Sequence, residues 1–426
     1  MQFQRSPMAR AMLLACAAYA QSFHTAHAAD ALPEVIVTTS PLAGSANEQV
    51  LTPARVVSGD ELRDRQAGTL GETLSHELGV SSSAFGAGAA RPVIRGLEGP
   101  RVKMLQNGMS VSDVSTLSND HAVATDTANA RQIEILRGPA ALLYGSGAIG
   151  GLVNVINDRI PTSLAPAPTG EAELRYGSVD RSKSLSLSLD GAAGAIGLHV
   201  DGNISNASDY RIPDNAVQDD PASASGRLPN SYARQNNLGF GLSTVQSWGY
   251  IGASVSTQDK RYGIPTEEQA QIDMRQNRYD IDSLVRNPFA GMESARLRIG
   301  YTDYEHDELD AAGTPQTNFR NRALETRLEL THERFAGWRG TLGVQANNER
   351  FSALAADGSG ATVPATRSNT VAGLLVAEKD VGPVRLRAGA RLVVSARRMT
   401  LTLSSAAAPF WAVLWPRLMA LQWADP

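Results

Sequence analysis

From residue 171 to residue 394 the chain alternates between apolar and polar residues. Residues 184–189 read SLSLSL, residues 196–201 read IGLHVD and residues 384–387 read VRLR. Successive side chains of a β-strand point to opposite faces, so this alternation predicts strands with one apolar and one polar face. We count about eleven such runs in this half of the chain.

The alternation alone does not distinguish a soluble β-sandwich from an outer-membrane β-barrel. In a sandwich the polar face meets water outside, whereas in an outer-membrane barrel it lines a wet lumen and the apolar face meets lipid. The spacing between runs favours the barrel, because short turns alternate with longer polar, proline-containing stretches such as residues 208–230 and 261–277.

Residues 56–160 follow a different pattern, with short apolar pieces and many glycines. Asn107-Gly108 lies between two apolar runs, which is a strong hairpin signal because both turn residues require positive φ. Residues 133–156 read IEILRGPAALLYGSGAIGGLVNVI, a glycine-rich loop between two strand-like pieces. These features predict a small domain with a mixed sheet. A phosphate-binding loop is the alternative, but the Lys-Ser/Thr that ends such a loop is absent.

Composition narrows the possibilities. Of the 426 residues, 42% are hydrophobic, 6% are aromatic and 38 are glycine, which is little material for two or three soluble cores. A net charge of −4 argues against a nucleic-acid-binding protein. Cys16 is the single cysteine, so a metal ion would need His, Asp and Glu ligands.

The two ends of the chain differ from the rest. Residues 1–28 have arginines before an apolar run and end in Ala-His-Ala, which predicts a cleaved export signal. A lipoprotein signal at Cys16 is a weaker alternative, because Leu14 is large for that motif. No run of about 18 apolar residues follows, so a membrane protein would have to cross with strands. In residues 399–426 the alternation stops, and we interpret this tail as unrelated to the strand-forming part of the chain.

Three segments together resemble one family. They are RPVIRGLEGPRVKMLQNGMSVSDVSTLSNDHAVATD, the glycine-rich 133–156 segment, and YTDYEHDELDAAGTPQTNFRNRALETRLELTHERFAGWRGTLGVQ. The chain is similar, over about residues 34–398, to the TonB-dependent outer-membrane receptors, and within them to the zinc-uptake, ZnuD-like branch. The resemblance implies a mainly β protein of the cell outer membrane, with an N-terminal α+β plug domain (46–161) inside an antiparallel β-barrel (170–398).

The resemblance also implies a set of binding partners and the absence of catalytic activity. The expected partners are the TonB complex of the inner membrane, outer-membrane lipid and a metal ion. We expect a monomer that binds no nucleic acid, catalyses no reaction and requires no cofactor beyond the transported zinc or other divalent metal. A TonB-contacting segment is expected within residues 29–45 at Glu34, Val35, Ile36, Val37 and Thr38, where an unpaired strand can add to a partner sheet. An ordinary first strand of the plug is the alternative.

Two acidic-histidine clusters fall in the similar segments. Imidazole and carboxylate are ligands that zinc accepts readily. Through the resemblance we assign metal ligation to Asp120 and His121 in the plug and to Glu305 and His306 in the barrel, with Glu308 as an alternate. The sequence predicts that residues 305–308 enter a loop directly after a strand over residues 295–304. Two hydrated loop ends without a ligand role are the alternative.

The remaining histidines and one loop without histidine weaken the assignment of zinc as the metal. His76, His199 and His332 are interpreted as structural, with His199 facing the lumen near the plug. Receptors of the zinc branch often carry a histidine-rich outer loop, but residues 262–277 contain no histidine. Nickel, cobalt and copper accept the same donors, so the ligands do not identify zinc by themselves.

The number of strands is the second departure from the family. Plugged outer-membrane transporters have about 22 strands, about twice the number of runs here. A plug of about 120 residues has a radius of gyration near ~13.6 Å, too large for a closed eleven-stranded barrel. We therefore expect an incomplete barrel and hypothesise a frameshift near residues 398–405. A siderophore or haem receptor of the same fold and a non-functional truncated remnant are the alternative functions.

Overall fold

The computed structural model describes residues 54–137, 144–145, 147–266 and 268–399. The predicted export signal, the predicted TonB-contacting segment (Glu34–Thr38) and residues 400–426 of the predicted tail lie outside these ranges. Within them, no helix has the length and apolar character needed to cross a membrane.

The N-terminal domain, called the plug below, is built from short elements. They are β1 (Ala54–Ser58), α2 (Gly59–Arg65), α3 (Leu70–Leu74), β2 (Val80–Ala84), β3 (Ala90–Ile94), the 3-10 helix η2 (Gly99–Arg101), β4 (Val102–Gln106), β5 (Met109–Ser110), β6 (Gln132–Leu136) and β7 (Gly151–Ile156). Five strands form one sheet in the order β1-β6-β7-β4-β5, in which β4 and β7 are parallel and the other pairs antiparallel. The predicted mixed sheet is therefore confirmed.

Local sequence explains two features of the plug. Asn107 and Gly108 have φ of 50° and 77°, so the predicted Asn-Gly turn is confirmed between β4 and β5. At Gly71, an added Cβ would lie 2.8 Å from backbone atoms of Ala90 and Arg91, so the glycine lets α3 pack directly on β3.

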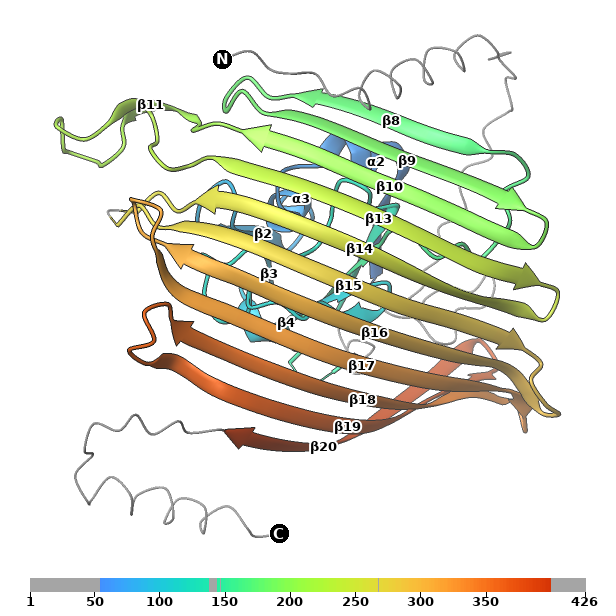
Figure 1. The fold of residues 1–426 in the computed structure, drawn as a ribbon. Coiled ribbons are helices and arrows are strands. Elements are labelled where there is room, and N and C mark those ends of the chain that lie inside the picture. The colour runs from blue at the N-terminus through green and yellow to red at the C-terminus, as the bar shows by residue number, and fades with distance from the viewer. Residues whose placement is uncertain (1–53, 138–143, 146, 267, 400–426) are drawn as a thin grey trace, which may run out of the picture. The chain divides into compact units, whose positions relative to one another are not determined.

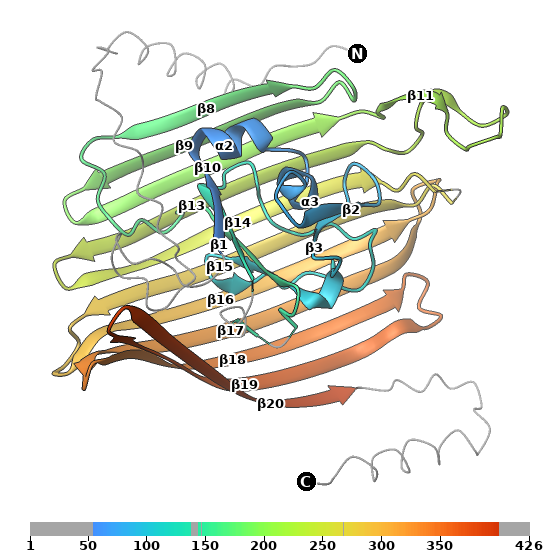
Figure 2. The ribbon, with the colours of Figure 1, turned by 180° about the vertical axis from the view of Figure 1, so that it is seen from behind.

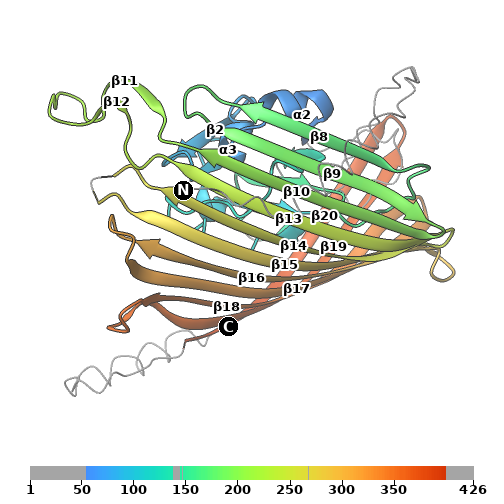
Figure 3. The same ribbon diagram turned by 45° about the horizontal axis from the view of Figure 1, so that its top comes forward.

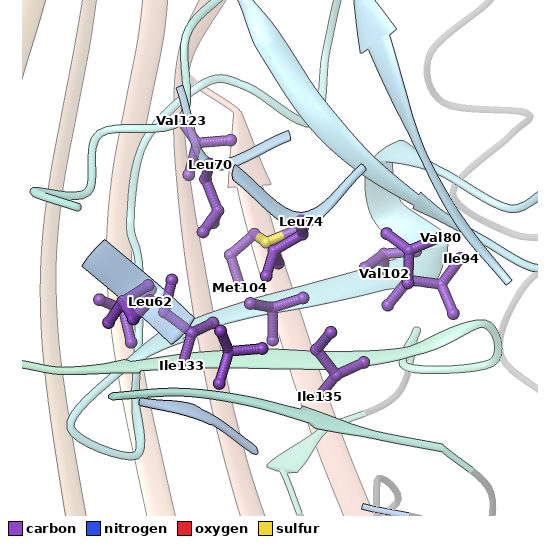
Figure 4. Packing of buried hydrophobic residues seen from close by; sticks show 13 residues of the cluster. Leu62, Leu70, Leu74, Val80, Ile94, Val102, Met104, Val123, Ile133 and Ile135 are labelled. Atoms are coloured by element: carbon purple, nitrogen blue, oxygen red, sulfur yellow. The ribbon is translucent and has the colours of Figure 1, made fainter. Parts of the chain in front are cut away.

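The core of the plug is a cluster of buried aliphatic side chains between its helices and its sheet (Figure 4). Leu62 of α2, Leu70 and Leu74 of α3, and Ile133 and Ile135 of β6 all belong to this cluster. Burial of such side chains removes about 1.5–3 kcal/mol each of unfavourable hydration. The plug thus has a dry core of its own, separate from its polar contacts with the second sheet.

The second sheet, called the wall below, has eleven strands in antiparallel order along the chain. They are β8 (Thr169–Tyr176), β9 (Lys183–Ala193), β10 (Ile196–Ala207), β13 (Ala233–Gln246), β14 (Gly249–Gly263), β15 (Gln271–Arg286), β16 (Met292–Leu309), β17 (Pro315–Phe335), β18 (Trp338–Ala355), β19 (Ala361–Val381) and β20 (Val384–Met399). A small hairpin, β11 (Arg211–Asn215) with β12 (Ser225–Arg227), extends from one end of the sheet (Figure 1).

The wall curves around the plug, which lies against its inner face (Figures 2 and 3). Strands β8 and β20 form the two edges and do not pair, so the described strands do not close into a barrel. The predicted fold class, a mainly β protein with an α+β plug and an incomplete antiparallel barrel, is confirmed, and so is the expected number of about eleven runs.

The two faces of the wall show which side meets lipid. On β10, Ile196, Leu198 and Val200 are exposed on the outer face, whereas His199 and Asp201 are buried against the plug. A water-soluble sandwich would have the opposite arrangement. Apolar residues outside and polar residues inside are the arrangement of an outer-membrane barrel, which decides between the two alternatives left open by the alternation.

One predicted loop is shorter in the structure than the sequence indicated, and another contains strands of its own. Strand β14 continues to Gly263 and β15 begins at Gln271, so only residues 264–270 separate them. Residues 208–230 contain the β11–β12 hairpin. Residues 261–263 and 271–277 thus belong to strands of the wall, whereas the β11–β12 hairpin is a separate two-stranded sheet.

Candidate metal centre

The plug contributes His121, a ligand candidate in the connection between β5 and β6. His121 is 3% exposed and its side chain reaches the wall. Its Nδ1 lies 3.4 Å from the carbonyl oxygen of Val114, and its Nε2 lies 3.1 Å from Oε1 of Glu308. The structure thus brings His121 and Glu308 together, although they are far apart in the sequence.

The wall contributes two candidates from β16. The sequence predicted residues 305–308 to be a loop, but β16 continues to Leu309, so this expectation is wrong. Within a strand the side chains alternate between faces, so His306 and Glu308 both face the plug. His306 is 1% exposed, and its ring centroid lies 4.7 Å from that of His121.

The three residues form a compact donor set. Among the residues that the structure describes, the ligand atoms of His121, His306 and Glu308 lie within 4.8 Å of one another. Two imidazoles and a carboxylate with one further position are a set that zinc uses. The end of the wall that carries them also carries the longer loops, such as residues 208–232, and longer loops are typical of the extracellular end of outer-membrane barrels.

The surroundings of His306 favour a ligand role for its Nε2. Its Nδ1 lies 3.0 Å from the hydroxyl oxygen of Tyr304, and its Nε2 is buried with no hydrogen-bond partner among the described residues. When Nδ1–H donates to that hydroxyl, Nε2 retains a lone pair. A hydrogen bond at the other ring nitrogen is the usual arrangement for a metal-binding histidine.

The surroundings of His121 favour a positive charge between its Nε2 and Glu308. Burial lowers the pKa of His121, but the hydrogen bond to Glu308 and the charges of Asp120 and Glu308 outweigh it, so the pKa is raised. Both ring nitrogens face oxygen acceptors, which an imidazolium satisfies. A proton or a divalent cation can therefore occupy the space between Nε2 and Glu308, but not both at once.

Of the other two predicted ligands, Asp120 lies beside the donor set and Glu305 lies away from it. Oδ1 of Asp120 lies 3.9 Å from Nε2 of His121 and is buried without a hydrogen-bond partner among the described residues, so Asp120 adjoins the donor set. Glu305 lies on the opposite face of β16, where its side chain is 48% exposed and 3.8 Å from Arg320. The structure does not bring Glu305 together with His121.

The remaining histidines lie apart from the donor set. His199 faces the plug, as expected, with Nδ1 2.7 Å from Asp190 and Nε2 3.4 Å from Asp201. His76 is exposed after α3, and Nδ1 of His332 on β17 lies 2.7 Å from the carbonyl oxygen of Glu333.

Two residues around the donor set were not found from the sequence. Tyr304 precedes His306 by two positions on the same face of β16, and strand alternation was the signal that could have revealed it. Phe319 of β17 stacks on His306 at 4.4 Å between ring centroids and shields it from water. Phe319 is paired with His306 by the register of β16 and β17, which no local pattern specifies.

The architecture described above is typical of one kind of membrane protein. A plug domain lies against the polar inner face of an antiparallel wall whose outer face is apolar, and a donor set is shared between plug and wall. This is the architecture of a plugged outer-membrane β-barrel receptor.

Comparisons with known proteins agree with this class. Residues 46–152 match the family described as TonB-dependent Receptor Plug Domain. A vitamin B12 transporter, BtuB, from Photobacterium profundum is 32% identical over 139 residues, which are 32% of this chain and 23% of that protein. The chain therefore carries a TonB-dependent receptor plug domain and is an outer-membrane protein.

Solved structures show the same fold at low identity. The copper transporter OprC has a TM-score of 0.66 and 16% identity, covering 81% of this chain and 55% of that one. The alcaligin outer-membrane receptor FauA from Bordetella pertussis has a TM-score of 0.63 and 18% identity, covering 87% and 60%. This chain thus spans somewhat more than half the length of these two structures.

Proposed function

We propose that this chain is a TonB-coupled outer-membrane receptor that binds a divalent metal ion for uptake, with zinc as the first candidate. The observation that carries the proposal is the convergence of His121 from the plug with His306 and Glu308 from the wall. Asp120 is the proposed fourth ligand. In this proposal the inner-membrane TonB complex supplies the work through residues 34–38, and the chain performs no catalysis.

The division of the ligands gives a physical route to release. A metal ion held by two plug ligands, His121 and Asp120, and two wall ligands is bound only while the plug stays in register with the wall. A pull that moves the plug by a few ångströms separates His121 from Glu308, which are 3.1 Å apart. Loss of one ligand of a small set weakens binding strongly, so plug movement would convert a tight site into a weak one.

The burial of the ligands favours a bare ion over a metal chelate. Pockets for drug-sized ligands have volumes of about 300–1,000 Å³. His121 and His306 are 3% and 1% exposed, and Phe319 packs against both rings. A siderophore or haem of that size would not reach these imidazoles without displacing the aromatic cover.

Metal binding by the purified chain is the first test. We expect zinc to bind with one ion per chain, and His121→Ala with His306→Ala to weaken binding more than about 100-fold, since loss of a supporting group alone costs 10–100-fold. His332→Ala is the matched control, because His332 lies on the wall outside the donor set. Equal affinity in the double variant and the control would refute the site.

Selectivity and transport need separate measurements. Titration with copper, nickel and cobalt under the same conditions ranks the metals, and tighter copper binding is expected from intrinsic preference alone. Uptake of radioactive zinc by cells that express the chain, with and without a functional TonB complex, tests transport. Uptake that is equal in both strains would contradict TonB coupling while leaving metal binding intact.

A further inference from the structure

A tyrosine on the wall contacts the peptide groups on both sides of His121. The hydroxyl of Tyr262, on β14, donates to the carbonyl oxygen of Asp120 at 2.8 Å and accepts from the backbone N–H of Ala122 at 2.9 Å. One hydroxyl therefore uses its donor and an acceptor site on the plug backbone that flanks the proposed ligand. These two bonds restrict the backbone at residue 121 more than a bond on one side would.

The ring of Tyr262 is itself held in place. The residue is 1% exposed, and an added Cβ at Gly88 of the plug would lie 2.2 Å from its Cγ, so the plug backbone passes directly against the ring. Nζ of Lys260 lies 5.6 Å from the ring centroid. The hydroxyl thus projects from a ring that is enclosed between the wall and the plug backbone.

Tyr262 shares a cross-strand row with one of the wall ligands. In the register of the sheet Tyr262 faces Ile272 of β15, and Ile272 faces Glu308 of β16. Neighbouring strands are about 4.8 Å apart, so Tyr262 and Glu308 are fixed about 10 Å apart by two hydrogen-bonded ladders. The wall therefore holds the plug ligand's backbone and a wall ligand in one rigid frame.

The other hydrogen bonds of the plug segment that carries His121 lie mainly within the plug. Asp113 accepts from the N–H groups of Ser115 and Ala124 at 3.0 and 2.8 Å, and Arg91 donates to the carbonyl oxygen of Ser118 at 3.1 Å. These bonds shape the segment but do not set its position relative to β16. Asn321 of the wall makes a longer contact, 3.4 Å, with the carbonyl oxygen of Asp113.

We propose that Tyr262 is a positioning residue that sets the geometry of metal coordination by fixing the backbone on both sides of His121 to the wall. This inference rests on the proposed function, because it requires that His121 ligates the metal. Tyr262 does not itself touch the ion. Its two hydrogen bonds must break when the plug moves away from the wall, so Tyr262 also links the integrity of the site to the position of the plug.

The test removes the hydroxyl and keeps the ring. In the full chain, Tyr262→Phe should raise the Kd for zinc about tenfold, equivalent to the loss of one to two net hydrogen bonds. Tyr250→Phe is the matched control, since Tyr250 is buried on the same face at the opposite end of β14, and its Kd should change by less than about twofold. Cobalt binding supplies a spectroscopic readout, because four-coordinate Co²⁺ absorbs visible light far more strongly than six-coordinate Co²⁺.

The visible absorption of bound cobalt should fall in Tyr262→Phe and not in Tyr250→Phe. In Tyr262→Phe, hydrogen exchange should become faster for the segment around Ala122. It should stay unchanged around Ser118, whose carbonyl oxygen accepts a hydrogen bond from Arg91. A Tyr262→Phe protein with unaltered Kd and cobalt spectrum would overturn the inference, and so would failure of this variant, but not of Tyr250→Phe, to fold.

The experiment separates this inference from the proposed function. Absence of zinc and cobalt binding in the unmodified chain, or binding that survives His121→Ala, would overturn both. Binding that is lost in His121→Ala but unaltered in Tyr262→Phe would overturn the positioning role alone.

Discussion

At the scale of single residues, the proposed site depends on which face of β16 a side chain occupies. Glu305 and Glu308 are three positions apart on one strand, so they point to opposite sides of the wall. Glu308 lies 3.1 Å from His121, whereas Glu305 lies near Arg320 outside. Two glutamates with the same chemistry therefore have different roles in the proposal.

Exchange of each glutamate for its amide tests this assignment. Glu308→Gln replaces an anionic ligand by a neutral one, and we expect zinc affinity to fall about 10–100-fold. Glu305→Gln removes the same charge from the other face, and its affinity should stay within about threefold. Isothermal titration of both variants measures the difference, and similar losses in the two would mean that charge, not position, controls binding.

The raised pKa of His121 gives the site a pH dependence. Metal binding requires the neutral imidazole, and the raised pKa means that protonation begins to compete at a higher pH than for an ordinary histidine. As pH falls through the pKa of His121, the Kd for zinc should rise, by about tenfold per pH unit once the imidazolium dominates. Titrations between about pH 8 and about pH 5 check this.

A control and an opposite outcome are available for the pH profile. Glu305→Gln should retain the profile of the unmodified chain, because Glu305 does not face His121. An affinity that stays constant across this pH range would show that His121 gives up no proton on binding, and His121 would then not be a ligand.

At the scale of elements, the plug is tied to the wall where the plug ends. Nε and Nη2 of Arg159 donate to the two carboxylate oxygens of Asp201 on β10, at 2.6 and 2.7 Å, and Nη2 also lies 3.2 Å from Asp126 of the plug. An added Cβ at Gly241 of β13 would lie 1.7 Å from the carbonyl oxygen of Arg159. A glycine in the wall thus makes room for the plug backbone.

Gly241→Ala should disturb this contact. The methyl group cannot fit without displacing the segment at Arg159, and overpacking of this kind costs about 1–3 kcal/mol of stability. We expect a lower unfolding temperature and faster release of the plug by protease. Gly373→Ala on β19 is the control, because an added Cβ there meets nothing within 4 Å. Equal stability of the two variants would show that the plug end adapts freely.

At the scale of the whole molecule, a metal shared by plug and wall should hold the two together. A ligand that binds only the native state stabilises it by about 2.7 kcal/mol at 100 times its Kd. Zinc should therefore raise the unfolding temperature of the full chain and slow hydrogen exchange in the plug near His121. His121→Ala should abolish both effects.

The matched variant for this measurement is Glu305→Gln, which should respond to zinc like the unmodified chain. Stabilisation by zinc that persists in His121→Ala would place the responsible metal site elsewhere in the chain. That result would count against a site shared between plug and wall.

Most of the local elements were predictable from the amino-acid sequence. Strand alternation has a period of two, so about eleven runs sufficed to predict the eleven-stranded wall. The Asn107-Gly108 turn was readable because few residues adopt positive φ at two successive positions. The plug domain was recognisable from the motifs around residues 91–156. The assignment of lipid and plug faces, however, required the structure.

The composition of the donor set, in contrast, depends on tertiary contacts. The sequence placed Glu305 and Glu308 in one loop, and the extension of β16 to Leu309 separated them onto two faces. The pairing of His121 with Glu308, the stacking of Phe319 on His306 and the bonds of Tyr262 to residues 120 and 122 join distant segments. Such contacts depend on sheet register and on the docking of one domain against another, and local hydrophobic patterns contain neither.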